Sequence, residues 1–156
     1  MSDALAALQE QTFARSTPAT TSAFPPERRL TGAQLARFLD RHVFAVVGSA
    51  RPDGRPHAAM SGYVRRETDF WLPTVRGSVR ERNVRSQPWV TLVVTEGEHG
   101  EHVVVLVEGT AVMVDPAEVP ADVRSASEGD WVSAWIRVRA GRLLSYADEG
   151  AGPTGP

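Results

Sequence analysis

The chain has 156 residues, of which 42% are hydrophobic and 23% charged, a composition typical of one folded domain. The absence of cysteine excludes disulfides, thiolate metal sites and cysteine nucleophiles. A net charge of −2 argues against general affinity for nucleic acid, and we expect no nucleic-acid partner. All 17 basic residues are arginine, which also excludes chemistry that needs a lysine amine.

The two ends of the chain differ in composition from its middle. Residues 1–26 contain two proline-bearing polar stretches and are predicted to be a flexible N-terminal arm, in which residues 4–13 can form a short amphipathic helix. Residues 149–156 are rich in Gly and Pro and are predicted to be a flexible tail. The folded domain is therefore expected over residues 27–148.

Cellular location is judged from the apolar patterning. No run approaches the roughly 18 apolar residues that a membrane-spanning helix needs, so we expect no membrane contact. The first ten residues lack the basic start and apolar stretch of a secretory signal. These patterns predict a cytoplasmic protein.

The domain begins with a helix signal. Thr31 followed by Gln34 forms a capping box, and a helix is predicted from there to His42. Its apolar residues recur on one face, at Leu35, Phe38 and Leu39.

Three strands are predicted next, separated by turns. Residues 43–48 are a continuous β-prone run, and residues 51–54 place Pro and Gly where a tight hairpin needs them. A return strand is expected over residues 55–64 and a third strand over residues 70–74.

The second half of the domain contains a short helix and further strands. Residues 77–87 are polar helix formers that end at Pro88. Strands are predicted at 89–95, 102–114 and 131–138, with a short edge strand at 143–146 and irregular or briefly helical chain at 116–130. The pattern predicts a mainly β protein, a six- to seven-stranded antiparallel split β-barrel with a few short helices.

The segment from 74 to 83 carries the strongest functional signal. Ser78 with Glu81 three residues later forms a second capping box, which predicts a helix N-terminus directly after a strand. The free amides of such a terminus, with the helix dipole, favour an anion. Gly77 permits close approach of the backbone, and Arg80 adds a forked cation that opposes the dipole unless an anion is bound.

A second interpretation of this segment remains open. Arg80, Arg82 and Arg85 can simply coat a solvent-exposed helix, with Glu81 as an ion-pair partner.

The stretch FWLPTVRGSVRERNVRSQPWVTLVV, residues 70–94, resembles the signature of the pyridoxamine 5'-phosphate oxidase-like flavoproteins. The hairpin at 50–57 is similar to the first β-turn of that superfamily, and residues 108–111 resemble its E-G-x-A strand. The resemblance implies an FMN-binding split barrel and a homodimer with the cofactor at the subunit interface. It covers about residues 35–115.

The resemblance also implies a set of cofactor-binding residues. Thr74 would contact the phosphate or ribityl chain, and Ser78 and Arg80 would hold the phosphate, beside Gly77 and Arg76. The strand from 57 to 63 would lie along the ring system, which adds these four residues: Ala58, Met60, Ser61 and Tyr63. Catalytic residues stay unassigned, although Tyr63 and Ser61 are candidate proton donors.

The chain departs from the oxidase itself on that strand. Where the oxidase carries Arg and Lys, this chain has Ala58-Ala59-Met60, so we do not expect vitamin B6 oxidation. The resemblance is closer to the flavin/deazaflavin oxidoreductase branch, which uses FMN or coenzyme F-420, a deazaflavin. We expect FMN, with the deazaflavin as the alternative because Arg76, Arg82 and Arg55 could meet its acidic tail.

Three further questions are left open or set aside by the sequence. The chain can be an oxidoreductase acting on a small organic substrate or a non-enzymatic flavin-binding or stress protein. His99 and His102 are three residues apart but lack a metal-binding pattern, so no metal site is expected. The tryptophans at 71, 89, 131 and 135 are predicted to lie on strands, in the barrel core or at the dimer interface.

Overall fold

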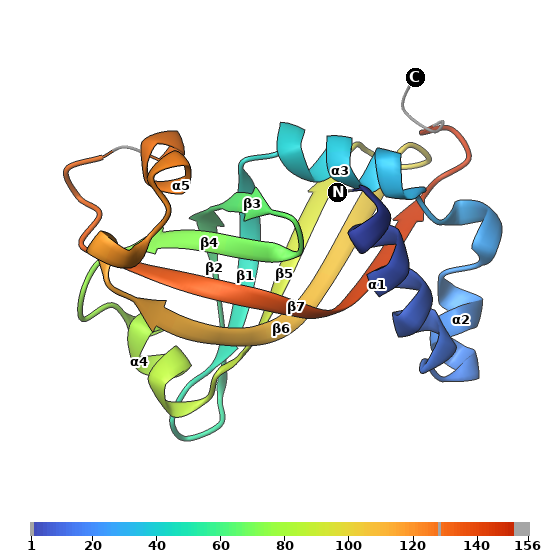
Figure 1. Ribbon diagram of the computed structural model, residues 1–156. Coiled ribbons are helices and arrows are strands. Elements are labelled where there is room, and N and C mark those ends of the chain that lie inside the picture. Colours follow the sequence, from blue (N-terminus) through green and yellow to red (C-terminus); the bar gives the residue numbers. More distant parts are fainter. Residues whose placement is uncertain (1, 128, 152–156) are drawn as a thin grey trace.

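The computed structural model describes residues 2–127 and 129–151 of the chain. Seven strands form one antiparallel sheet in the order β2-β1-β5-β6-β7-β4-β3 (Figure 1). The predicted class, a mainly β antiparallel split barrel with a few short helices, is confirmed. The strands are β1 (Phe44–Ala50), β2 (Pro56–Gly62), β3 (Val64–Arg66), β4 (Asp69–Thr74), β5 (Trp89–Glu96), β6 (Val103–Val114) and β7 (Ala134–Ala147).

The sheet curls because its two outermost strands are consecutive in the chain. β2 and β3 are joined by Tyr63 alone, so the two edges of the sheet return toward each other. β2 comes close to β4, but no hydrogen-bonded ladder joins these two strands in the described chain. This opening between β2 and β4 is the split of the barrel, and it leaves one edge of β2 unpaired.

The hydrophobic core fills the inside of the curled sheet. Strands β5 and β6 alternate between buried and partly exposed residues, as expected for strands with one face on a core. The largest fully buried side chains include Phe70, Leu72, Leu92, Ile136 and Leu143. A smaller cluster around Trp71 and Trp135 packs outside this core.

Helix α3 (Gly32–Arg41) begins at the predicted capping box. The Gln34 amide donates to the Thr31 hydroxyl over 3.3 Å, and the Gln34 side chain accepts the Thr31 amide at 2.8 Å. Its three predicted apolar residues, Leu35, Phe38 and Leu39, are buried against the barrel. The remaining short elements are 3₁₀ turns at Pro26–Arg28 and Pro116–Glu118, and helices α4 (Val79–Ser86) and α5 (Ala121–Ala126).

The last strand differs from the prediction of two separate pieces. β7 is one strand of 14 residues that lies between β6 and β4, inside the sheet rather than at its edge. Gly141 is an extra residue in its pairing with β6, since Glu108 pairs with Arg142 and Gly109 with Ala140. This bulge lets one strand continue through a glycine that in the sequence resembled a turn.

The segment expected to be a flexible arm is mostly helical in the structure. Helix α1 (Ser2–Ala14) lies against the barrel beside β7 and α3, and helix α2 (Pro18–Ala23) follows it and buries none of its residues (Figure 1). Leu5 is fully buried in the main core. The polar residues of α1 also have partners: the Gln9 amide donates to the Leu30 carbonyl at 2.8 Å, and the Thr12 hydroxyl accepts the Leu143 amide at 3.0 Å.

The sequence indicated a mobile arm because of its two proline-bearing stretches, although a short helix was expected at residues 4–13. Gln9 and Thr12 are buried in α1, and their polar side chains gave no sign of that burial. The predicted tail at 149–156 lies mostly outside the described residues. No helix in the described chain is both long and apolar enough to cross a membrane.

Candidate binding pocket

Helix α4 begins directly after the turn that follows β4. Ser78 is its N-cap, and the Ser78 hydroxyl accepts the Glu81 amide at 3.1 Å. The Glu81 carboxylate reaches back to the amide of Gly77, one residue earlier than in a standard capping box, and also accepts Arg85 at 3.0 Å. The hydrogen bond from the Gly77 amide lowers the pKa of Glu81, and the hydrogen bond from Arg85 lowers it further. This carboxylate is therefore ionised and held within the turn.

The turn itself depends on glycine. Gly77 has a φ of +80°, a left-handed conformation that side-chain-bearing residues rarely adopt. This conformation directs the Gly77 amide toward Glu81 and places the Ser78 hydroxyl 3.1 Å from that of Thr74, at the end of β4.

Arg80 lies on the first turn of α4 and crosses the split to β2. Its guanidinium donates to the Ser61 hydroxyl at 3.3 Å and to the Met60 carbonyl oxygen at 3.1 Å. That carbonyl belongs to the unpaired edge of β2, so Arg80 satisfies an acceptor that the sheet leaves free. Burial lowers the pKa of Arg80 from its usual value, which reflects partial removal of the cation from water.

A pocket of about 380 Å³ lies at this split. Its polar side is formed by Thr74, Ser78 and Arg80, and its apolar side includes three side chains that are more than half exposed. These are Phe44, Met60 and Trp131. The pocket therefore combines hydrogen-bond donors at one side with a hydrophobic wall at the other.

The donors on the polar side fit an anion such as a phosphate monoester. Val79 and Arg80 occupy the first two positions of α4, where backbone amides have no acceptor within the helix. The hydroxyls of Thr74 and Ser78 lie 3.1 Å apart, so one donates to the other and one hydroxyl proton remains for a ligand, beside the donors of the guanidinium. The ionised Glu81 carboxylate offsets part of the helix dipole, but it pairs with Gly77 and Arg85, and among the described residues no carboxylate pairs with Arg80.

The structure brings together five of the residues predicted from the sequence. Met60, Ser61, Thr74, Ser78 and Arg80 all line the pocket at the split. Among the other predicted residues, Gly77 and Arg76 form the exposed turn that precedes α4.

Tyr63 lies apart from this pocket. Its hydroxyl donates to the Leu39 carbonyl at 2.7 Å, under helix α3, and its side chain is buried. Burial raises the pKa of Tyr63, and the nearby negative charge of Asp40 raises it further, so the phenol stays protonated. In this position Tyr63 attaches α3 to the barrel.

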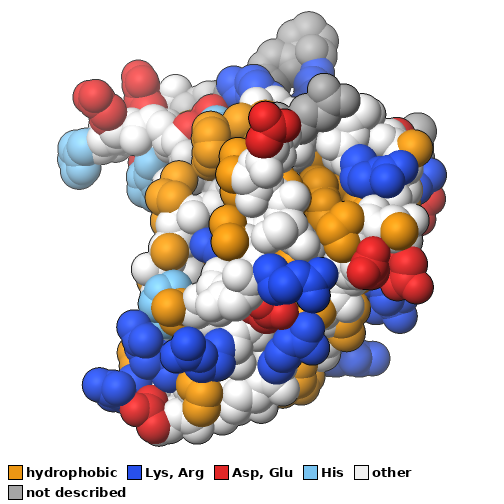
Figure 2. Space-filling model, turned by 90° about the vertical axis from the view of Figure 1, so that its left-hand side faces the viewer, with side chains coloured by type: hydrophobic (Ala, Val, Ile, Leu, Met, Phe, Trp, Pro, Cys, Tyr) orange, Lys and Arg blue, Asp and Glu red, His pale blue; other side chains and the backbone are white. Residues whose placement is uncertain are grey.

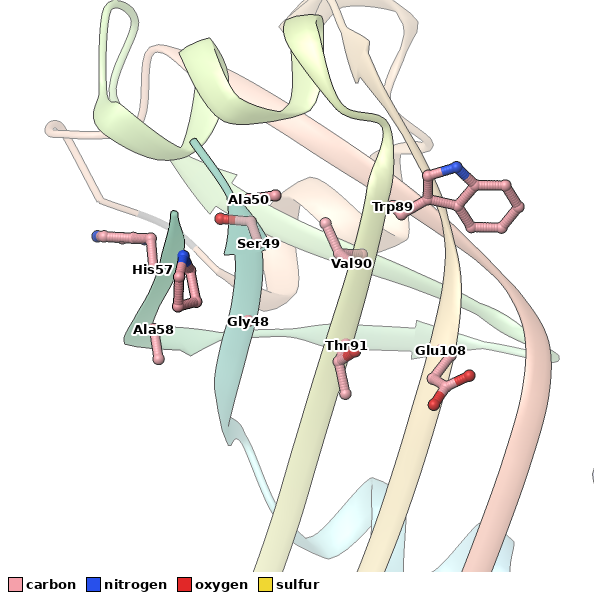
Figure 3. A pocket seen from close by; sticks show the side chains of 10 residues that line it. Gly48, Ser49, Ala50, His57, Ala58, Trp89, Val90, Thr91 and Glu108 are labelled. Atoms are coloured by element: carbon pink, nitrogen blue, oxygen red, sulfur yellow. The ribbon is translucent and has the colours of Figure 1, made fainter. Parts of the chain in front are cut away.

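Ala58 lines a second pocket, of about 600 Å³, on the outer face of the sheet. Figure 3 shows this pocket, with His57 on β2 beside Ser49 on β1, and with Trp89 and Glu108 on β5 and β6. Its one carboxylate, on Glu108, pairs with Arg142 at 3.1 Å. No arginine lines this pocket among the described residues, so it does not share the anion-binding character of the pocket at the split.

Sequence reasoning missed Phe44 and Trp131 as pocket residues. Phe44 begins β1 and was hidden in a run of apolar residues with no sign of which face each residue occupies. Trp131 was assigned to a strand, but it lies in the turn before β7. The position of Phe44 at the start of a predicted strand could have indicated it as a pocket residue. No feature of the sequence indicated Trp131.

The outer face of the sheet exposes further apolar side chains. In the view of Figure 2, hydrophobic side chains (orange) lie between groups of arginines (blue). The strand registers place Phe44, Met60 and Trp89 on the same face, and each is at least 61% exposed.

Among the described residues, no group of three His, Asp or Glu side chains is placed to bind a metal ion.

Comparison with solved structures shows the same fold in proteins of low sequence identity. The conserved hypothetical protein Rv2991 from Mycobacterium tuberculosis aligns with a TM-score of 0.69 and 21% identity, over 83% of this chain and 92% of that one. General Stress Protein 26 from Bacillus anthracis aligns with a TM-score of 0.64 and 16% identity, over 75% and 94%. An FAD-binding protein from Mesorhizobium loti aligns with a TM-score of 0.63 and 18% identity, over 76% and 93%.

Among curated proteins, none matches the chain significantly. A family model described as pyridoxamine 5'-phosphate oxidase matches residues 31–148, which is most of the chain and includes both β2 and the turn before α4. The chain belongs to the pyridoxamine 5'-phosphate oxidase family.

Proposed function

We propose that this chain binds FMN in the pocket at the split and acts as an oxidoreductase on a small organic substrate. The observation that carries the proposal is that a partly buried cation and two hydroxyls line one pocket at the N-terminus of helix α4. In this proposal Arg80, Ser78 and Thr74 hold the phosphate. The ring system extends along β2 toward the apolar wall that Met60 and Phe44 provide.

Bound FMN would supply the hydride transfer, and the protein would supply position and electrostatics. Ser61 has a positioning role in this arrangement, since its hydroxyl accepts from Arg80 and donates to the Gly62 carbonyl at 2.9 Å. Both contacts fix the part of β2 that the ring would follow.

The proposed cofactor pocket is open on the side of the exposed apolar face, which favours a homodimer with the cofactor between subunits. Phe44, Met60 and Trp89 would be covered by the second subunit, and their burial would favour association. Light scattering at micromolar concentration is expected to give twice the mass of the chain. A monomer under these conditions would contradict an interface site.

A deazaflavin coenzyme is the second candidate for this pocket. Arg76 and Arg82 are exposed at the same end of α4 as Arg80, where they could meet an acidic tail. Arg55 is less available, because its guanidinium pairs with Asp53 at 2.8 Å.

A non-enzymatic role is the third candidate. The side chains that line the pocket include hydroxyls and a guanidinium but no carboxylate or histidine, so no proton-transfer group of ordinary strength faces it. The structural likeness to a general stress protein fits such a role.

Ligand titration distinguishes these candidates. FMN and riboflavin differ only in the phosphate, so FMN is expected to bind at least about tenfold more tightly, which corresponds to 1.4 kcal/mol. Equal affinities for FMN and riboflavin would show that the pocket has no phosphate site. If the protein quenches deazaflavin fluorescence and does not bind FMN, the deazaflavin coenzyme becomes the first candidate cofactor. Reduction of quinones, enones or nitro compounds by the reduced complex would support an enzyme over a binding protein.

A further inference from the structure

Trp131 lies at the mouth of the pocket at the split. Its side chain is 57% exposed, whereas Trp71 and Trp135 are buried in the smaller hydrophobic cluster. It faces the same pocket as the exposed side chains of Phe44 and Met60. Three large apolar side chains that surround one pocket and remain largely in water indicate a surface that a ligand covers.

The turn that carries Trp131 is fixed to the proposed phosphate segment. The Val132 amide donates to the Gly129 carbonyl at 3.1 Å and closes the turn. Ser133 then makes two hydrogen bonds: its amide donates to the Thr74 carbonyl at 3.1 Å, and its hydroxyl accepts the Arg76 amide at 2.7 Å. The backbone that carries Trp131 is therefore fixed relative to the end of β4 and the start of α4.

The orientation of the indole is also constrained by its own turn. A Cβ atom placed on Gly129 would lie 2.5 Å from Nε1 of Trp131, so the ring folds closely over the glycine backbone. The ring thus lies against the turn instead of extending freely into water.

We propose that Trp131 is the wall of the pocket against which the ring system of the bound flavin packs. This inference rests on the proposed function and adds the residue that selects a flat aromatic ring next to the phosphate donors. Aromatic pairs gain energy beyond the area that they bury. An indole in contact with an excited flavin donates an electron to it and takes that electron back, which quenches the flavin emission. The contact therefore has a spectroscopic signature that does not depend on turnover.

The test compares Trp131→Ala and Trp131→Phe with Trp71→Phe, a change at a buried tryptophan that does not line this pocket. FMN affinity is measured by equilibrium dialysis, and the emission of bound FMN is measured at saturation. Trp131→Ala is expected to weaken FMN binding about tenfold and to brighten the bound cofactor. Trp131→Phe is expected to retain most of the affinity and to brighten the cofactor, while Trp71→Phe matches the parent in both.

The outcomes separate this inference from the proposed function. If the parent does not bind FMN, the proposed function fails and the inference fails with it. If the parent binds FMN but both Trp131 variants keep its affinity and its quenched emission, only the inference fails. Brightening in Trp71→Phe alone would identify Trp71 as the quenching indole and would also overturn it. Trp131→Phe keeps an aromatic ring at an exposed position, which guards against loss of folding.

Discussion

The guanidinium of Arg80 lies 3.1 Å from the carbonyl oxygen of Met60 and thereby joins helix α4 to the unpaired edge of β2. A guanidinium has five N–H donors, and the contacts to Met60 and Ser61 leave others for a ligand. Arg80 thus both closes one side of the split and supplies positive charge to the pocket. This double role is the basis of the proposed phosphate site.

Ser78→Ala tests the N-cap of α4. Loss of the hydroxyl that accepts the Glu81 amide is expected to cost about 1 kcal/mol of unfolding free energy, measured by urea denaturation. FMN affinity is also expected to fall, because the same hydroxyl faces the pocket. Thr31→Ala is the matched control, since Thr31 caps α3 away from the pocket. Equal FMN affinity in the two variants would remove Ser78 from the site.

Glu81 makes part of the stability dependent on pH. Its pKa is lower in the folded chain than in the unfolded chain, so its contribution is complete above the unfolded value, about 4.3, and is lost as pH falls through the folded value. The free energy of unfolding is therefore expected to fall as the pH drops below about 5, and to fall less in Glu81→Gln. Parallel pH profiles for the parent and the variant would show that this carboxylate does not hold the turn.

Leu5→Ala tests whether α1 is part of the folded domain. Leu5 is fully buried in the main core, so its truncation is expected to cost about 2–5 kcal/mol in urea denaturation. Glu10→Ala on the exposed face of α1 serves as the control, with a change below about 0.5 kcal/mol. If both variants change the free energy of unfolding by less than about 0.5 kcal/mol, α1 is not part of the folded core and the sequence-based prediction of a flexible arm holds.

Tyr63→Phe separates a structural residue from a cofactor-binding one. Loss of its hydrogen bond to the Leu39 carbonyl is expected to cost about 0.5–1.5 kcal/mol of stability. FMN affinity is expected to stay at the parent value, because Tyr63 does not line the pocket at the split. A large loss of affinity at unchanged stability would return Tyr63 to the site.

Much of the fold follows from local sequence patterns. The capping box at Thr31, the hairpin after β1 and the strand before Ser78 each depend on a few adjacent residues, and the structure has all three. The continuity of β7 could not be predicted in this way. It depends on a bulge at Gly141 and on pairing with two other strands, which are contacts between distant parts of the chain.

The polar half of the candidate pocket was more predictable than the apolar half. Ser78 and Arg80 are close in sequence, and their placement follows from the geometry of one helix turn. Tyr63 and Ser61 are only two residues apart on a predicted strand, yet the chain bends between β2 and β3 and directs Tyr63 toward α3. Phe44 and Trp131 reach the pocket only through the tertiary fold.

The most direct test of the phosphate site asks whether Arg80 contributes more to binding when the ligand carries a phosphate. FMN and riboflavin affinities are measured by equilibrium dialysis for the parent, for Arg80→Ala, and for Arg82→Ala as an exposed control on the same helix. Arg80→Ala is expected to lose about 10- to 150-fold in FMN affinity, the worth of one charge-assisted hydrogen bond. The loss in riboflavin affinity is expected to be smaller and to come only from the lost contacts to Met60 and Ser61. Arg82→Ala is expected to match the parent with both ligands. An equal loss for FMN and riboflavin, or no loss at all, would contradict a phosphate site at Arg80.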